Sequence, residues 1–291
     1  MTAVYDVGSN SIRMIVFDGD RAVLKRKVNC RLGEGIAASG RLSEQAIVRA
    51  IAAFAQLKRL AETAGVKEGE HFAFATEAVR RAENGSEFLF SAGDAFGIKC
   101  EIIDGDTEAE IGLCGVLSGG DGAILDIGGA SSELAVRAGG KIVYSKSLKV
   151  GAGVLRDAFL NDKKSLIKAA AEYAEQYGDI PQIKVLYAIG GTASGCGYVA
   201  NGLLSYDERK IDGLAVNAGV IGDICDKLFL FDDDERAVEF HLDENRAKVL
   251  PYGAALMCAV IKKCAPEKVI ISERSNVEGY YERLKSSGIS G

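Results

Sequence analysis

Two short polar segments contain the residue types of a phosphate-binding site. Residues 6–11 are DVGSNS and residues 126–132 are DIGGASS, and each follows an apolar run. Glycine lets backbone N–H groups approach an anion closely, short hydroxyls add donors, and successive amides in a tight turn form a concave anion site. The alternative is a pair of ordinary β-turns. The candidate phosphate-binding residues are Gly8, Ser9, Asn10, Ser11, Gly128, Gly129 and Ser131.

Three acidic residues accompany these turns and need a separate explanation. Asp6 and Asp126 open the two segments, and Glu133 follows the second. A carboxylate beside a phosphate turn would repel the anion unless a cation lay between them. We therefore expect Asp6, Asp126 and Glu133 to orient Mg²⁺ or Mn²⁺, partly through water. The alternative is an aspartate that caps its own turn and a solvated glutamate.

A third glycine-rich segment lies further along the chain. Gly190, Gly191 and Thr192 stand between an expected strand and an expected helix, so the helix N-terminus would add another anion site. A simple strand-to-helix turn is the alternative. The chain has no GxxxxGK[ST] motif and is not a P-loop protein.

Arg80 and Glu108 could supply the remaining chemistry. Arg80 ends TEAVR, which leaves an apolar strand, and its guanidinium could fork onto a phosphoryl oxygen. Glu108 lies in the first turn of an expected helix and could act as a general base. A surface arginine and a glutamate favoured by the helix dipole are the alternatives.

The hydrophobic pattern indicates how these residues are positioned. It predicts βαβ alternation with parallel strands, and thus an α/β fold. The two aspartates lie 120 residues apart in matching segments, which indicates a duplicated fold with one copy per lobe and a cleft between them. The predicted lobes are 1–117 and 118–291, with a hinge at the glycine-rich 118–122 and a last helix, about 276–291, that could pack back on the first lobe. The expected strands are 2–7, 12–17, 71–75, 100–103, 123–127, 133–136, 185–188 and 268–272, and the expected helices are 43–65, 86–96, 106–117, 246–263 and 276–285.

Composition excludes several classes of protein. The chain has 291 residues, is 48% hydrophobic and carries a net charge of −6, so we expect no nucleic-acid or membrane-surface binding. We expect a cytoplasmic protein, because no secretory signal opens the sequence and no apolar run is long enough to span a bilayer. Seven cysteines without a CxxC pair are expected to be reduced and buried. With only His71 and His241, a zinc site or a histidine-dependent triad is not expected.

In order along the chain, the motifs resemble one known family. They are DVGSNSIRM, RLGEGI with GRLSEQAI, ATEAVR, the pair Glu108-Ala109, DIGGASSEL, IGGTAS and RAKVLPYGAAL. This series is similar to the exopolyphosphatase and guanosine pentaphosphate phosphatase (Ppx/GppA) family, in its short two-domain form, from about residue 3 to residue 284. The resemblance implies the two-lobed actin-like ATPase fold, which is ribonuclease H-like, with an interdomain cleft.

The resemblance also implies roles for individual residues. Glu108 matches the general base that activates water, and Arg80 matches a ligand of the terminal phosphoryl group. The glycine-rich segments match phosphate loops, while Asp126 and Glu133 match carboxylates around the divalent metal. The implied activity is that of a phosphoanhydride hydrolase acting on polyphosphate or guanosine pentaphosphate.

Some features leave alternatives open. Ala130 stands where the family motif usually has a third glycine, and the chain lacks the extra C-terminal helical domains of long members, so we do not expect processive action on long polyphosphate. A non-catalytic sensor of guanosine tetra- or pentaphosphate, or an actin-like ATPase or kinase, are the alternative functions. A homodimer is also considered, because soluble enzymes commonly dimerise.

Overall fold

The chain folds into two compact units, each built around one β-sheet. The computed structural model describes residues 1–117 and 119–288, except the side chain of Ala37. The first unit comprises residues 1–115 and 276–291, and the second comprises residues 116–275. The predicted hinge begins at Ser118 and the predicted last helix runs to Gly291; Ser118 and residues 289–291 lie outside the described residues.

The first unit has a five-stranded sheet in the order β3-β2-β1-β4-β5. The strands β1 to β3 are antiparallel neighbours, whereas β4 and β5 continue the sheet parallel to β1. This confirms the expected hairpin at the start and the βαβ alternation after it. The strands are β1 Thr2–Val7, β2 Ser11–Asp18, β3 Arg21–Asn29, β4 His71–Ala75 and β5 Lys99–Ile102.

The second unit repeats this order with one added edge strand. Its six-stranded sheet runs β10-β11-β9-β6-β7-β8, so that β8-β7-β6-β9-β11 corresponds to the first sheet. The strands are β6 Gly122–Ile127, β7 Ser132–Ala138, β8 Lys141–Leu148, β9 Val185–Ile189, β10 Ala215–Val216 and β11 Lys268–Ile271.

The two sheets also share irregular details at the same 120-residue offset. The register of β2 and β3 shifts between Val16 and Phe17, and that of β7 and β8 shifts between Val136 and Arg137. A β-bulge is a specific structural feature that bends and twists a strand. Its recurrence at equivalent positions supports a duplicated fold, as the paired segments of the sequence indicate.

Three edge strands were not predicted from the sequence, namely β3, β8 and the two-residue β10. β3 and β8 carry mostly half-exposed or exposed side chains, and charged residues interrupt the alternation of apolar and polar positions. An edge strand with lysine and arginine is protected from pairing with another chain, which explains why its pattern is weakly hydrophobic. Each opening hairpin is therefore a three-stranded meander.

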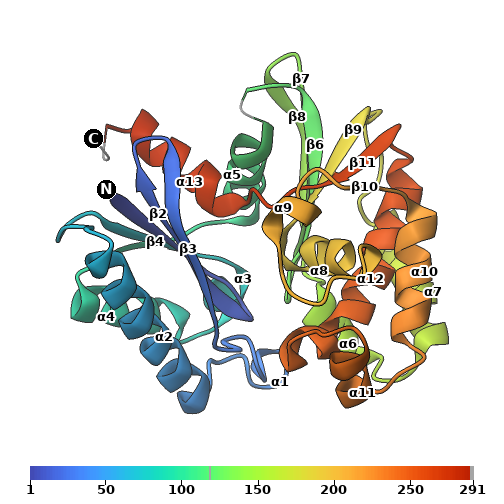
Figure 1. The fold of residues 1–291 in the computed structure, drawn as a ribbon, viewed down its shortest axis with the longest axis horizontal. Helices are drawn as coiled ribbons and strands as arrows, with labels where there is room; N and C mark the ends of the chain where they lie inside the picture. The colour runs from blue at the N-terminus through green and yellow to red at the C-terminus, as the bar shows by residue number, and fades with distance from the viewer. Residues whose placement is uncertain (118, 289–291) are drawn as a thin grey trace. The chain divides into compact units, whose positions relative to one another are not determined.

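Helices cover both faces of the first sheet. One core joins α2 and α4 to one face, and another joins α5 and α13 to the other (Figure 1). Helix α2 starts where the sequence predicts, because the Ser43 side chain accepts a hydrogen bond from the Ala46 amide. The helices are α1 Ile36–Ser39, α2 Glu44–Thr63, α3 Glu77–Arg81, α4 Gly85–Phe96, α5 Gly105–Leu117 and α13 Asn276–Ser286.

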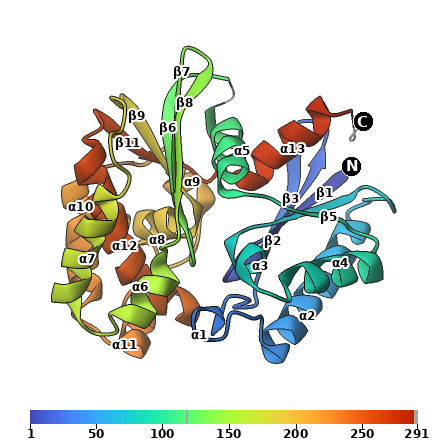
Figure 2. The same ribbon diagram turned by 180° about the vertical axis from the view of Figure 1, so that it is seen from behind.

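In the second unit most helices gather against one face of the sheet. Side chains from α7, α8, α10 and α12 join those of the sheet in one core (Figure 2). Pro251 lies inside α12, so it does not end the helix there. The helices are α6 Ala152–Ala158, α7 Lys163–Glu175, α8 Gly190–Ala200, α9 Glu208–Ile211, α10 Ala218–Leu228, α11 Asp233–Glu239 and α12 Glu244–Cys264.

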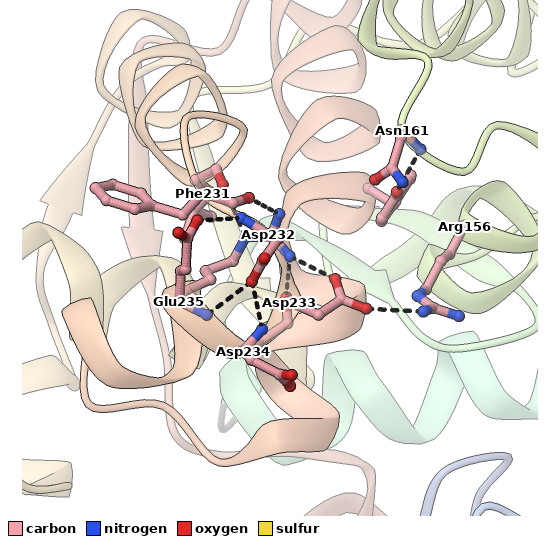
Figure 3. A network of polar contacts seen from close by, with 11 residues as sticks. Arg156, Asn161, Phe231, Asp232, Asp233, Asp234 and Glu235 are labelled. Carbon is pink, nitrogen blue, oxygen red and sulfur yellow. Dashed lines mark hydrogen bonds and ion pairs between the residues drawn. The ribbon is translucent and has the colours of Figure 1, made fainter.

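A polar network connects α6 to the start of α11 (Figure 3). Asp233 receives the Arg156 guanidinium at 2.8 Å and that of buried Arg236 at 2.9 Å, while Asp232 caps α11 by accepting two backbone amides. Arg236 also donates to three backbone carbonyls. Arg156 Nε has no hydrogen-bond partner among the described residues, so the network joins the helices at this corner mainly through Asp233 and Arg236.

Helix α13 packs directly on α5, the helix that carries Glu108. A Cβ atom built on Gly279 would lie 1.7 Å from the carbonyl oxygen of Ile111, and Tyr281 stacks on Phe17 with ring centroids 4.0 Å apart. Replacing Gly279 by alanine therefore forces α13 away from α5. We expect a loss of about 2–4 kcal/mol in the free energy of unfolding, measured by urea titration.

A second helical glycine provides the control for this prediction. A Cβ on Gly222 of α10 would meet only the Cys258 sulfur, at 3.6 Å. Gly222→Ala should be neutral or stabilising by up to about 1 kcal/mol, because alanine favours helix. Equal effects of the two substitutions would show that the α5–α13 approach is not tight.

The buried His71 should make the stability of the first unit depend on pH. Its Nδ1 lies 2.9 Å from the Tyr5 hydroxyl, and burial, followed by the nearby Lys58, lowers the pKa of His71, while Glu62 and Glu70 oppose the shift. The unfolded state therefore binds a proton more readily than the folded state. Stability is full above about pH 6.5 and is lost as the pH falls below it.

We expect His71→Gln to reduce this loss between pH 7.5 and 5.5 by up to about 1 kcal/mol per pH unit, because glutamine does not titrate. Urea titrations at each pH measure the slope. The other histidine of the chain, His241, is exposed, and His241→Gln should leave the slope as it is. An unchanged slope in His71→Gln would contradict the prediction.

Among the residues that the structure describes, no helix combines the length and the apolar character needed to cross a lipid bilayer.

Candidate functional site

The chemistry-bearing residues of the first unit follow the carboxyl ends of three neighbouring parallel strands. β1 ends before the turn at Gly8, β4 ends before α3 with Arg80, and β5 ends before α5 with Glu108. Parallel strands bring their carboxyl ends to one edge of the sheet, where α/β proteins bind ligands. The topology therefore places these predicted residues at a common edge.

The first glycine turn is held by backbone hydrogen bonds that leave amides available. The Gly8 amide donates to the Ser11 carbonyl at 3.1 Å, and the Gly33 amide donates to the Ser9 carbonyl at 2.7 Å. Within the described part of the chain, the amides of Ser9 and Asn10 donate to no backbone carbonyl. The turn thus offers backbone donors suited to an anion, and the binding of phosphate there stays a prediction.

Arg80 lies between two buried carboxylates, one of which the sequence did not single out. Its Nε and Nη2 donate to Glu77 Oε2 at 3.1 and 2.5 Å, and its Nη1 donates to the Ile103 carbonyl at 2.5 Å. Nη1 also lies 3.7 Å from Glu108 Oε2. Glu77 and Glu108 are 4% and 6% exposed, so the guanidinium neutralises acidic groups that water cannot reach easily.

The backbone at the start of α5 fixes the position of Glu108. The Asp104 carboxylate accepts the Thr107 amide at 2.8 Å, and the Glu108 amide donates to the Asp104 carbonyl at 2.9 Å. Mainly because of the Thr107 amide, the pKa of Asp104 lies below its usual value. Glu108 thus occupies the first helical turn on a rigid backbone, as predicted.

Asp6 has a cationic neighbour across the sheet. Arg13 of β2 stands directly opposite Asp6, and Lys27 of β3 stands opposite Arg13. Burial raises the pKa of the Asp6 carboxyl to about 6, and the charge of Arg13 partly opposes this. A buried carboxylate that resists ionisation would gain from a cation, which is consistent with the predicted metal role.

The second glycine turn repeats the first, and α6 holds it in place. The Gly128 amide donates to the Ser131 carbonyl at 3.0 Å, and the Gly153 amide donates to the Gly129 carbonyl at 2.9 Å. Both bonds are the 120-residue counterparts of those in the first turn. A Cβ on Gly151 would lie 2.5 Å from the Gly128 carbonyl oxygen, so only glycine fits where the chain crosses this turn.

Two acidic residues and a serine of the second unit form a row across three strands. Asp126, Glu133 and Ser147 are successive partners in β6, β7 and β8. Glu133 is 2% exposed, and its Oε1 accepts a hydrogen bond from the Ser147 hydroxyl at 2.8 Å. The equivalent row of the first unit is Asp6, Arg13 and Lys27. In the first unit the aspartate is thus followed by two cationic side chains, and in the second unit by a glutamate and a serine.

The segment Gly190–Thr192 packs against this acidic row. Gly190 has φ +77°, and a Cβ there would lie 2.2 Å from Asp126 Oδ1. Thr192 is buried and donates its hydroxyl hydrogen to the Ile127 carbonyl at 2.8 Å, so that hydrogen serves the fold. The Arg246 guanidinium donates to the Gly191 carbonyl. Gly190 thereby gives Asp126 its space, a role that the sequence did not predict.

The donor set of the second unit fits a hard divalent cation. Among residues 1–117 and 119–288, no group of three or more His, Cys, Asp or Glu side chains could ligate a metal. Mg²⁺, however, is commonly held by one or two carboxylates, with water and substrate phosphates completing its shell. Asp126 and the buried Glu133, directly opposite each other, fit that pattern.

Two units share this strand order, and in each of them an Asp-apolar-Gly segment leads from the first strand into a turn. These features define the class of this protein as the two-lobed actin-like fold. The family model of the Ppx/GppA phosphatase family matches residues 15–286, and the chain belongs to this family. The expectation of a hydrolytic enzyme, and the resemblance found in the motifs, are thereby confirmed.

Relatives of known sequence agree with this assignment. A bifunctional 3-dehydroquinate synthase/phosphatase of Fusobacterium nucleatum subsp. nucleatum is 26% identical over 96% of this chain, which spans 46% of that protein. Exopolyphosphatase 2 of Mycobacterium tuberculosis is 24% identical, covering 95% of this chain and 96% of that protein.

Solved structures share the fold over nearly the whole chain. The Aquifex aeolicus member of the Ppx/GppA family superposes with a TM-score of 0.80 at 26% identity, covering 98% of both chains. An exopolyphosphatase from Cytophaga hutchinsonii gives a TM-score of 0.86 at 21% identity over 100% of this chain and 99% of that chain, a likeness of fold alone.

The structure adds residues that sequence reasoning missed, namely Glu77, Arg13, Ser147 and Arg246. The sequence alone could have identified Arg13 and Glu133 as equivalent positions of the two repeats, because each follows its aspartate by seven residues. Ser147 and Arg246 had no such signal, since they reach their partners through β8 and α12, distant in sequence.

Proposed function

We propose that this protein hydrolyses a terminal phosphoanhydride bond, releasing phosphate from inorganic polyphosphate or guanosine pentaphosphate. Family membership supports the reaction class. A relative that covers most of the chain bears the name exopolyphosphatase 2, which favours polyphosphate as the first substrate to test. The observation that carries the proposal is the arrangement of buried Glu108 beside a fixed Arg80, with Nη1 and Oε2 3.7 Å apart.

The proposed reaction is an in-line displacement at the terminal phosphorus. A water oxygen forms the new bond to phosphorus as the bridging P–O bond breaks, and Glu108 takes the proton of the attacking water. Arg80 and the amides of the glycine turns stabilise the charge on the phosphoryl oxygens. The shortened phosphate chain is a good leaving group, so no strong general acid is required.

Asp126 and Glu133 are the residues proposed to hold Mg²⁺ or Mn²⁺ in the second unit, and Asp6 is the carboxylate proposed for this role in the first unit. A bound divalent ion would neutralise negative charge on the phosphates and orient them. Asp6 and Asp126 begin the two glycine turns and Glu133 stands opposite Asp126, so these carboxylates adjoin the amides proposed to bind phosphate.

The proposal includes a homodimer and a cytoplasmic location. Both are compatible with a phosphate-releasing enzyme of acidic net charge. The same charge gives no general attraction for a long polyanion, so short chains or a guanosine-capped substrate are the favoured forms.

Phosphate release by the purified protein tests the proposal. Short polyphosphate, long polyphosphate and guanosine pentaphosphate are compared with Mg²⁺, with Mn²⁺ and with a chelator. We expect metal-dependent release from at least one substrate. No release from any of them, while guanosine tetraphosphate still binds, would favour a sensor; ATP turnover that depends on an acceptor would favour a kinase.

A further inference from the structure

The orientation of Arg80 depends on Glu77. Both Nε and Nη2 of the guanidinium donate to the same oxygen of Glu77, and Nη1 donates to the Ile103 carbonyl. Three of the five N–H donors of Arg80 are thus committed to the protein. The hydrogens that remain, one on Nη1 and one on Nη2, can point only where these bonds direct them.

Glu77 is an unusual residue to bury if packing were its only role. Its side chain is 5% exposed, and its Oε1 has no hydrogen-bond partner among the residues that the structure describes. A buried carboxylate oxygen without a donor costs free energy, and apolar replacements of buried ion pairs are often as stable. The presence of a charge here therefore calls for a function other than stability.

That function follows from the competition for Arg80. Glu108 is the other buried carboxylate within reach, with its Oε2 3.7 Å from Arg80 Nη1, beyond hydrogen-bond distance. A guanidinium free to turn would pair closely with Glu108, which would stabilise the ionised form of that carboxylate and weaken it as a base. Two bonds to Glu77 oppose this movement.

We propose that Glu77 is a positioning residue, which holds Arg80 toward the phosphoryl group and away from a close ion pair with Glu108. This inference rests on the proposed function, in which Arg80 and Glu108 act on the substrate. Glu77 is the glutamate of the ATEAVR segment. By binding Arg80 it prevents a close ion pair between Arg80 and Glu108, so that Arg80 can bind the phosphoryl group while Glu108 acts as the base.

Two further carboxylates, Asp104 and Asp106, belong to the start of α5. Asp104 precedes α5 and is influenced by Arg80 and by Arg283 of α13, and Asp106 lies in the first turn of α5. Arg283 is 3.5 Å from Glu101 of β5. Because Arg80 also acts on Asp104, a change at Glu77 reaches Asp104 as well, and the effect on Glu108 is therefore read from Glu108 itself.

Two substitutions test separately the charge of Glu77 and the length of its side chain. Glu77→Gln keeps the length and an acceptor but removes the charge, so Arg80 favours Glu108. We expect kcat to fall about tenfold or more with KM changed less than about threefold, and the acidic limb of the kcat profile to move down by about 0.5–1 pH unit. Glu77→Asp keeps the charge but shortens the side chain, so kcat should fall while the limb stays in place.

A second readout does not depend on turnover. The pKa of Glu108, measured by NMR of carboxyl-labelled glutamate and assigned with Glu108→Gln, should be lower in Glu77→Gln than in the natural protein. The matched control is Glu83→Gln, since Glu83 follows the same helix and forms an exposed ion pair with Arg41. It should change neither the pH profile nor the resonance.

The outcomes distinguish this inference from the proposed function. If Glu108→Gln keeps full activity, the proposed function fails and the role of Glu77 falls with it. If Glu108→Gln is inactive but Glu77→Gln keeps the natural kcat, pH profile and Glu108 pKa, only the role of Glu77 is overturned. Should Glu77→Gln not fold, natural kcat in Glu77→Asp overturns it.

Discussion

Replacing Glu108 by glutamine is expected to lower kcat for phosphate release by about 10²–10⁴-fold, the range that a general base contributes. Glutamine has nearly the same shape but cannot accept the proton of the attacking water at neutral pH. Substrate binding should change little, because the proposed phosphate contacts come from Arg80 and the glycine turns. Steady-state phosphate release with Mg²⁺, together with substrate affinity by calorimetry, measures both quantities.

Glu110→Gln is the matched control, because Glu110 lies on the same helix but is exposed. It should retain the natural kcat, and thermal unfolding should show that both variants fold. Activity in Glu108→Gln within about threefold of that of Glu110→Gln would exclude Glu108 as the base and require another residue to activate water.

Gly190→Ala is expected to give the largest loss of stability among the site variants. Alanine at φ +77° costs about 1–2 kcal/mol, and its Cβ would lie 2.2 Å from Asp126 Oδ1, which adds an overpacking cost of about 1–3 kcal/mol. The total expected loss in the free energy of unfolding is about 2–5 kcal/mol. Because Asp126 must move, the Mg²⁺ concentration for half-maximal activity should also rise.

Gly202→Ala separates the two costs. Gly202 follows the same helix, has φ +56°, and nothing lies within 4 Å of a Cβ built there. It should show only the backbone cost of about 1–2 kcal/mol, with an unchanged Mg²⁺ requirement. Urea titration and a Mg²⁺ titration of activity test both variants. Equal losses, or an unchanged Mg²⁺ requirement in Gly190→Ala, would show that Asp126 does not depend on this contact.

Glu108→Gln and Gly190→Ala are expected to affect activity in different ways. Glu108 acts through its charge at the rigid start of a helix, so its replacement should lower kcat and leave the free energy of unfolding nearly unchanged. Gly190 acts through the absence of a side chain, so its replacement should disturb the fold and reach the chemistry only through Asp126. A comparison of stability with activity therefore distinguishes a proton acceptor from a residue that provides space.

Much of the fold follows from short-range signals in the sequence. The Ser43 cap, the apolar spacing of α2 and the alternation in β1 and β2 each arise from interactions within a few residues, and these elements form where expected. The edge strands β3 and β8 were missed for the same reason, because their pairing depends on a neighbouring strand more than on their own hydrophobicity.

By itself, the sequence determined the duplicated α/β fold, the family, and the residues that follow the carboxyl ends of strands. Turn residues and motifs record local backbone geometry, which repeats wherever the same strand and turn recur. Only the tertiary structure decided that Arg80 bonds Glu77 at 2.5 Å while Glu108 stays 3.7 Å away, and that Gly190 makes room for Asp126. Such contacts join residues from different elements, and their distances depend on how helices and strands pack, which residue types and spacing do not encode locally.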